Sequence, residues 1–192
     1  MNTPLPHSAA LQIRSLFISA GHSMTDPGAV GVGGISEADI VLNFRDRLYD
    51  FLSDRIVLAR DGKPGVNLPL RQACEMAKRH DIAVEFHCNA AASPHATGTE
   101  TLSAPKDDAF GERLCAAISR TLGISNRGDK GEADGQHSRL AFVRAGGVIV
   151  ELFFLTNPDD LKAYRQHLDA LVEAVGIELI NRVCASAHEI AA

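Results

Sequence analysis

The sequence FISAGHSMTDPGAVGVGGIS, at residues 17–36, decides how the rest of the chain is interpreted. It joins a short apolar run to a glycine-rich loop that contains His22, and Glu37 follows at once. An apolar run bounded by turn residues is typical of a buried strand. Ser36 and Asp39 stand at the spacing of a capping box, so Glu37 is expected to open a helix. A strand that leads to a His, followed by a carboxylate at a helix start, can supply half of a metal site.

Two further apolar runs carry residues that bind metals or transfer protons. Residues 84–89, VEFHCN, contain His87, and residues 148–152, VIVEL, contain Glu151. Sites in parallel sheets lie beyond the carboxyl ends of the strands. The three runs together therefore predict one site at one edge of a sheet.

The order of the elements predicts an α/β fold: a single domain with a mostly parallel twisted sheet and helices on both faces. We expect a loose N-terminal arm at 1–10 and a catalytic domain at 11–192. Strands are expected at 11–18, 55–59, 82–87, 98–103 (at an edge), 140–143 and 148–152. Helices are expected at 37–53, 68–80, 107–122 and from about 159 or 167 to 182, and a polar binding loop at 128–138.

Composition excludes several classes of function. A net charge of -5 without a Lys/Arg cluster argues against nucleic acid as the partner. The absence of Trp gives little support for a surface that stacks on sugars. The four cysteines lack CxxC spacing, which favours a reduced, cytosolic protein. We expect no signal peptide and no membrane span, so the chain would stay in the cytoplasm until it is released or exported by another route.

Two imidazoles and a carboxylate leave an open fourth position on Zn²⁺, which is the pattern of hydrolytic sites. A second carboxylate is then needed to move the proton of the attacking water. Each candidate also has a simpler interpretation: His87 as a core histidine and Glu37 as a first-turn acid that complements the helix dipole. Glu151 is harder to explain in this way, because burying an acid inside GGVIVELFFL is unfavourable without a cation or a partner.

The chain resembles the zinc-dependent N-acetylmuramoyl-L-alanine amidases of bacteria and their phages, which detach the stem peptide from peptidoglycan. The matching segments are GHSMTDPGAVG at 21–31, Glu37, LARDG at 58–62 with Arg71, EFHCNAA at 85–91, GTE at 98–100, NRGDK at 126–130 and VELFFLTNPDD at 150–160. Together they cover about residues 13–180. The resemblance implies His22, Glu37 and His87 as Zn²⁺ ligands and Glu151 as the catalytic acid/base.

The sequence departs from the family pattern in two places near these residues. Ser23 and Met24 replace the usual Gly-Gly, and Cys88 replaces a common Ala. Adjacent strand residues point to opposite faces, so Cys88 is expected to pack in the core while Asn89 shares the side of His87 and contacts substrate. His137, in the polar loop, is a weaker second candidate for substrate binding.

The predicted function is that of an endolysin-like enzyme that uses zinc-activated water to cleave the amide between N-acetylmuramic acid and L-alanine. Its partner would be peptidoglycan or its muropeptide fragments. Two alternatives stay open: a zinc peptidase that acts on peptide stems, and a non-catalytic, metal-containing module that binds the cell wall. A binding module has no need for an acid at position 151, so Glu151 separates the enzyme from the module.

Overall fold

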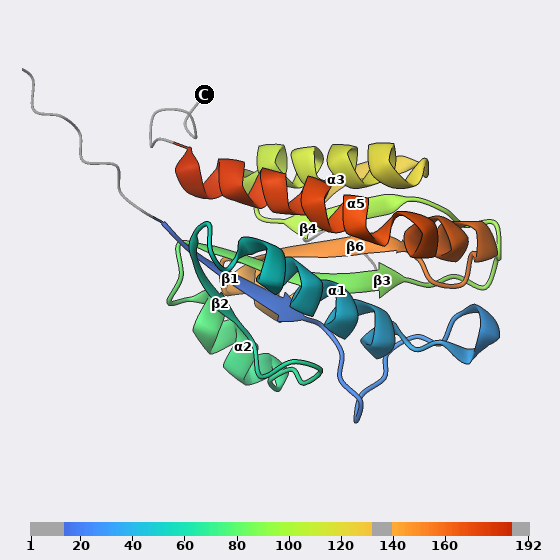
Figure 1. Cartoon of the computed structure of the whole chain (residues 1–192), viewed down its shortest axis with the longest axis horizontal. Helices are drawn as coiled ribbons and strands as arrows, with labels where there is room; N and C mark the ends of the chain where they lie inside the picture. Colours follow the sequence, from blue (N-terminus) through green and yellow to red (C-terminus); the bar gives the residue numbers. More distant parts are fainter. Residues whose placement is uncertain (1–13, 132–139, 186–192) are drawn as a thin grey trace, which may run out of the picture.

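A twisted sheet forms the centre of the fold, and the helices pack against it (Figure 1). The computed structural model describes residues 14–131 and 140–185, and within them six strands form one sheet in the order β2-β1-β3-β6-β4-β5. The strands are β1 (Ser15–Ala20), β2 (Val57–Arg60), β3 (Ile82–Asn89), β4 (Thr99–Ser103), β5 (Asn126–Gly131) and β6 (Val148–Phe154). All neighbouring strands pair in parallel except β4 and β6. The prediction of a mostly parallel sheet is confirmed.

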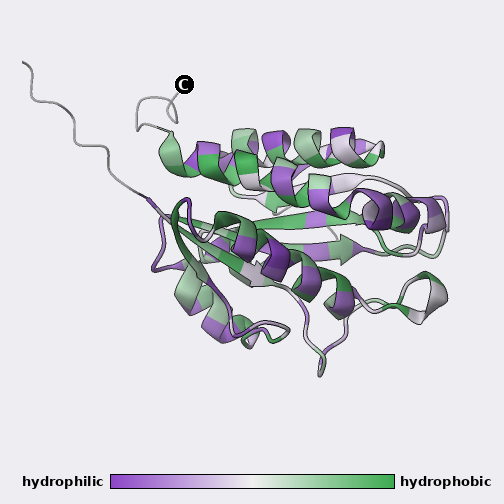
Figure 2. Cartoon of the chain, viewed as in Figure 1, coloured by the Kyte–Doolittle hydropathy of each residue, from purple (hydrophilic) through white to green (hydrophobic). Residues whose placement is uncertain are grey.

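Helices cover both faces of this sheet, as the sequence predicts. The helices α1 (Glu37–Leu52), α3 (Asp108–Leu122) and α5 (Pro158–Cys184) bury their apolar residues in one core, together with alternate residues of β1, β3 and β6. The shorter helices α2 (Leu70–Ala77) and α4 (Ala141–Arg144) pack in a second core on the other face. Two 3₁₀ turns, η1 (Val32–Gly34) and η2 (Pro105–Asp107), complete the described elements. Figure 2 shows apolar residues concentrated in the strands, whereas the helices alternate polar and apolar residues.

Helix α1 begins where the sequence predicts. Ser36 is its N-cap: the Ser36 side chain accepts a hydrogen bond from the Asp39 amide, and the Asp39 carboxylate accepts one from the Ser36 amide. This capping box fixes Glu37 at the first helical position, beside the end of β1. Among the described residues, no helix combines the length and the apolar character that crossing a membrane requires.

Several predicted elements are wrong. β4 is not at an edge, because it lies between β6 and β5. Residues 126–131 form the edge strand β5, so the first part of the predicted loop at 128–138 is a strand that pairs with β4. Residues 140–143 are not a strand: Leu140 caps the short helix α4, whose Phe142 and Val143 insert into the second core. A short apolar run cannot separate these two outcomes without the rest of the fold.

Helix α5 resolves an alternative that the sequence left open. It begins at Pro158, and its backbone leaves helical geometry at His167, the second of the two expected starts. The predicted arm at residues 1–10 lies outside the described residues, as do residues 132–139 with His137.

Candidate metal centre and active-site cleft

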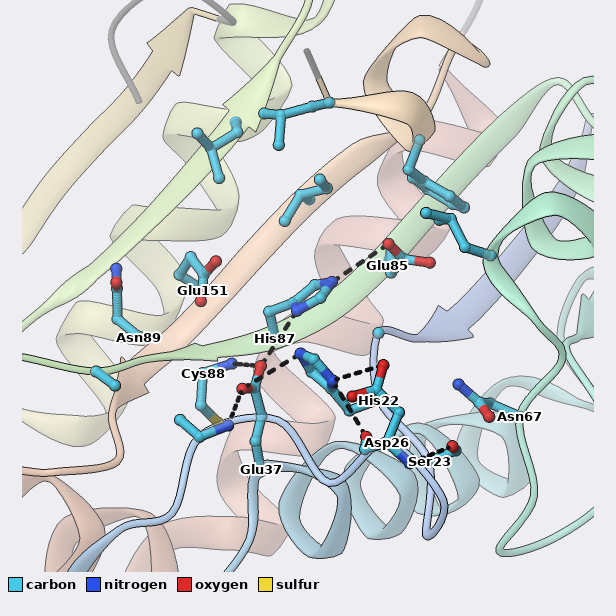
Figure 3. Close-up of a pocket in the computed structure, with 18 of the residues that line it drawn as sticks. His22, Ser23, Asp26, Glu37, Asn67, Glu85, His87, Cys88, Asn89 and Glu151 are labelled. Carbon is cyan, nitrogen blue, oxygen red and sulfur yellow. Dashed lines mark hydrogen bonds and ion pairs between the residues drawn. The ribbon is translucent and has the colours of Figure 1, made fainter. Parts of the chain in front are cut away.

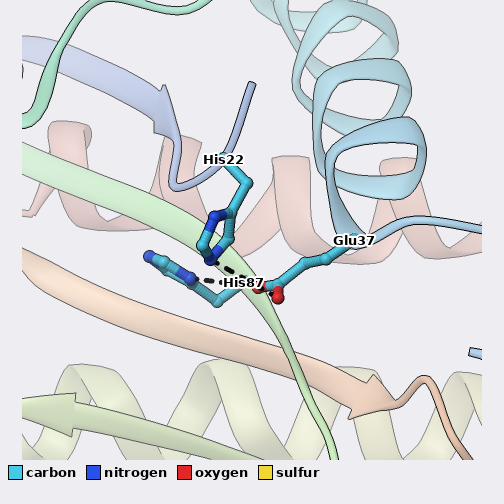
Figure 4. A group of neighbouring side chains, drawn as sticks. All are labelled: His22, Glu37 and His87. Carbon is cyan, nitrogen blue, oxygen red and sulfur yellow. Dashed lines mark hydrogen bonds and ion pairs between the residues drawn. The ribbon is translucent and has the colours of Figure 1, made fainter. Parts of the chain in front are cut away.

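Three predicted ligands come together at the carboxyl end of the sheet (Figure 4). His22 follows β1, Glu37 opens α1 and His87 lies near the end of β3. One ligand atom from each residue lies within 4.8 Å of the other two. The two imidazole rings stand edge to face, with centroids 5.2 Å apart. The arrangement thus joins a loop, a helix start and a strand end, as the sequence predicts.

Glu37 is the centre of this group. Its Oε1 lies 3.1 Å from His87 Nδ1, and its Oε2 lies 3.4 Å from His22 Nε2. The same carboxylate accepts hydrogen bonds from the backbone amides of Ala29 and Cys88. Burial opposes the negative charge, but the contacts with His87, the Cys88 amide and His22 outweigh it and hold the pKa of Glu37 below its ordinary value. Glu37 therefore does more than complement a helix dipole.

His22 is oriented by the loop that follows it. Its Nδ1 lies 3.3 Å from the carbonyl oxygen of Asp26, which can only accept, so Nδ1 donates to this carbonyl and Nε2 is the nitrogen that faces Glu37. Gly28 closes the loop over the ring with φ of 68°, and a Cβ there would lie 2.6 Å from Glu37 Oε2. Only glycine combines that backbone conformation with so close an approach.

His87 lies between two carboxylates, and the sequence predicted only one of them. Its Nε2 is 3.2 Å from Oε1 of Glu85, a residue that is 3% exposed. Burial alone would lower the pKa of His87, but the hydrogen bonds with Glu37 and Glu85 and the charge of Glu151 raise it well above its ordinary value. The signal for Glu85 was available: it is an acid inside the apolar run VEF, two residues before His87 and therefore on the same strand face.

Glu151 faces the same site from the neighbouring strand. It is the register partner of His87 across β3 and β6, and its Oε2 is buried without a hydrogen-bond partner in the described part of the chain. Burial raises the pKa of Glu151 to about 7; the charge of His87 opposes this shift, and the charges of Glu37, Glu100 and Glu85 add to it. A carboxyl group with a pKa near neutrality can both accept and return a proton.

The site lies in a cleft of about 1640 Å³ (Figure 3). Its walls differ in character. One wall carries the exposed apolar side chains of Met24, Val66 and Leu70. The cleft exceeds the roughly 300–1,000 Å³ typical of small-molecule sites, so it has room for an extended ligand.

The opposite wall is polar and includes Asn89, as the sequence predicts. The Asn89 carboxamide donates a hydrogen bond to Glu100 (2.8 Å), and Glu100 pairs with the Arg127 guanidinium (2.6 Å). Arg127 in turn lies over the ring of Phe154, 5.1 Å from its centroid. Cys88 points away from this wall into the first core, as expected, and burial raises the pKa of its thiol well above the ordinary value.

The residues present fit a Zn²⁺ ion. Two imidazoles and one carboxylate are common catalytic zinc ligands. Three carboxylates (Glu37, Glu85 and Glu151) surround His87, and within residues 14–131 and 140–185 no Lys or Arg pairs with any of them. Gathered acids of this kind require a compensating cation. A dication held between His22, Glu37 and His87 would supply it.

Known proteins resemble the chain over most of its length. The family model for N-acetylmuramoyl-L-alanine amidase matches residues 16–176. A Neisseria meningitidis structure assigned as an N-acetylmuramoyl-L-alanine amidase is 36% identical, with a TM-score of 0.83 over 90% of this chain and 97% of that one. The uncharacterized protein YqiI of Bacillus subtilis is 30% identical to this chain over an alignment that covers 84% of this chain and 83% of YqiI. The N-acetylmuramoyl-L-alanine amidase LytC of the same organism is 26% identical over 79% of this chain, which spans 32% of LytC.

Proposed function

The chain belongs to the N-acetylmuramoyl-L-alanine amidase family of peptidoglycan hydrolases, and we propose that it works through a Zn²⁺ centre formed by His22, Glu37 and His87. The bond cleaved is the amide between the lactyl group of N-acetylmuramic acid and L-alanine. The observation that carries this proposal is the presence of three ligand atoms within 4.8 Å of one another, beside Glu151, whose buried Oε2 has no hydrogen-bond partner among the described residues.

A Zn²⁺ ion bound by these residues would polarise the scissile carbonyl and acidify a water molecule beside it. The chain supplies the remaining steps. Glu151 accepts a proton as the water oxygen bonds to the carbonyl carbon, and it returns that proton to the L-alanine nitrogen as the carbon–nitrogen bond breaks. Burial raises the pKa of Glu151 and the charge of a nearby dication would lower it, so the two effects oppose each other at the group that must accept and return the proton. Glu37, held by two backbone amides, keeps its oxygens directed at His22 and His87.

The cleft fits a ligand that is part sugar and part peptide. Asn89 contacts the substrate on the polar wall, on the same side of β3 as His87. His137 stays a prediction. Because peptidoglycan lies outside the cytoplasmic membrane, the chain acts after release or export.

A zinc peptidase that cuts within the stem would use the same residues, and a non-catalytic module would keep the fold and the metal without turnover. Glu151 disfavours the module, because a module that only binds the metal through His22, Glu37 and His87 has no need for a further buried acid whose Oε2 lacks a hydrogen-bond partner among the described residues. The bond that is cut separates the amidase from the peptidase.

The test is mass spectrometry of fragments released from purified peptidoglycan by the zinc-loaded protein. We expect new L-alanine amino termini and intact lactyl carboxyl groups; new ends within the stem would identify a peptidase instead. His22→Ala should lose both zinc and activity. His80→Ala is a control, because His80 is a half-buried imidazole whose Nδ1 contacts the Met76 carbonyl and whose ring stacks on Phe17, and this variant should retain both zinc and activity.

A further inference from the structure

Glu85 has a place in the site that the proposed reaction does not use. Among the described residues, its side chain forms hydrogen bonds with His87 and Ser19 and with neither His22 nor Glu37. We infer that Glu85 and Ser19 form a positioning device that holds His87 in the tautomer presenting Nδ1 to the metal. This inference rests on the metal centre proposed above and adds two residues to it.

The two nitrogens of His87 face different carboxylates. Nδ1 lies 3.1 Å from Glu37 Oε1, and Nε2 lies 3.2 Å from Glu85 Oε1 (Figure 3). A neutral imidazole has one N–H and one lone pair, and a carboxylate can only accept. If Nε2 donates to Glu85, the lone pair must be on Nδ1, the nitrogen that faces Glu37 and His22. Metal-bound histidines commonly donate their second N–H to a carboxylate in this way.

Glu85 is itself held in place. The Ser19 hydroxyl donates a hydrogen bond to Glu85 Oε2 (3.1 Å), and Ser19 is fully buried. The two residues are register partners on β1 and β3. Because side chains alternate along a strand, Glu85 and His87 share one face of β3. The hydroxyl, the carboxylate and the imidazole are thus all aligned by the sheet, which is more rigid than a loop.

The His87 ring is also confined by the backbone. A Cβ added at Gly21 would lie 2.0 Å from both Cε1 and Nε2 of His87, so the ring packs directly on the bare backbone of residue 21. The Glu85 carboxylate and this backbone together leave the ring little freedom to rotate. A ligand fixed in this way loses less entropy when the metal binds.

The test measures Zn²⁺ affinity by chelator competition and the His87 tautomer by long-range ¹H–¹⁵N NMR. Removing the group that accepts a hydrogen bond from a metal-binding histidine typically lowers metal affinity by ~10–100-fold. We expect Glu85→Leu to lower the Zn²⁺ affinity by that factor. In Glu85→Leu, His87 should also no longer be held in the one tautomer that carries its proton on Nε2. Glu85→Gln keeps an acceptor oxygen at the same place, so it should keep the tautomer and lose less affinity.

Ser19→Ala and Ser103→Ala form a matched pair. Both serines are fully buried, and each hydroxyl donates to a carboxylate at about the same distance: Ser19 to Glu85 (3.1 Å) and Ser103 to Asp129 (3.0 Å). Both variants should lose similar stability, but only Ser19→Ala should bind zinc more weakly. If Glu85→Leu has wild-type zinc affinity and an unchanged His87 tautomer, the positioning role of Glu85 is overturned but the proposed metal centre is not. Failure of the wild-type protein to bind zinc would overturn the metal centre and this inference together.

Discussion

Gly21→Ala adds a single methyl group next to the proposed metal centre. Gly21 does not adopt a positive φ, so alanine fits its backbone, and the three atoms nearest to an added Cβ all belong to the His87 ring. The added Cβ would lie 2.0 Å from Cε1 and Nε2 of that ring, whereas ordinary contacts begin at 3.4 Å. The ring must therefore move by roughly 1.4 Å, the difference between these two distances. That shift exceeds the tolerance of both the 3.2 Å contact with Glu85 and the 3.1 Å contact with Glu37.

Two losses should follow from this displacement. A misplacement of about 1 Å in a catalytic constellation costs about 10²-fold in rate, and we expect at least that loss of turnover on purified peptidoglycan. Zinc affinity, measured by chelator competition, should fall by ~10–100-fold. Both measurements are made on protein whose melting temperature has been recorded, so that unfolding is not mistaken for loss of the site.

Gly147→Ala is the control for this variant. Its Cβ would lie 2.2 Å from the Phe142 ring, in the second core and away from the ligands. Gly147 also has no positive φ. It should therefore lose stability in the same way, by about 1–3 kcal/mol of overpacking, yet retain wild-type zinc affinity. Equal zinc affinities in the two variants would refute the claim that residue 21 positions His87.

Three further predictions concern the base, the metal and pH. Glu151→Gln should lose ~10²–10⁴-fold in turnover while keeping zinc, because it retains shape but cannot take a proton; loss of zinc instead would make Glu151 a ligand. Chelation should lower the melting temperature reversibly, since a metal that binds only the native state stabilises it, and an unchanged melting curve after verified zinc removal would contradict a site that joins three elements. Burial raises the pKa of Asp129 from 3.8 to about 6, so the folded state binds more protons than the unfolded state and stability falls as pH rises through this range. Asp129→Asn should then raise the melting temperature at pH 8, and a gain that persists unchanged at pH 4 would show that the charge is not its cause.

The meeting of His22, Glu37 and His87 was predictable from sequence because of how parallel sheets are built. β3 and β6 are neighbours with their carboxyl ends at one edge, so His87 and Glu151 become register partners. The capping box at Ser36 fixed the start of α1 and with it the place of Glu37. Alternation along β3 correctly assigned Cys88 to the core and Asn89 to the cleft.

The secondary-structure predictions were wrong where tertiary contacts outweigh the local conformational preference of the residues. The polar run at 126–131 forms a strand because β4 offers it a partner, with Thr101 and Ser103 donating to Asp129. Residues 140–143 are as apolar as a strand, but their place in the second core is filled by one turn of helix. Glu85 was overlooked because a single acid in a strand does not reveal its partner, although its spacing from His87 carried the same information that singled out Glu151.

We propose that His22, Glu37 and His87 bind one zinc ion. The most direct test is an anomalous difference map recorded at the zinc absorption edge from a crystal of the zinc-loaded protein. We predict one peak at about 2.0–2.2 Å from His22 Nε2, His87 Nδ1 and a Glu37 oxygen. A fully occupied peak bound elsewhere, or one held by Glu85 or Glu151 in place of Glu37, would contradict it.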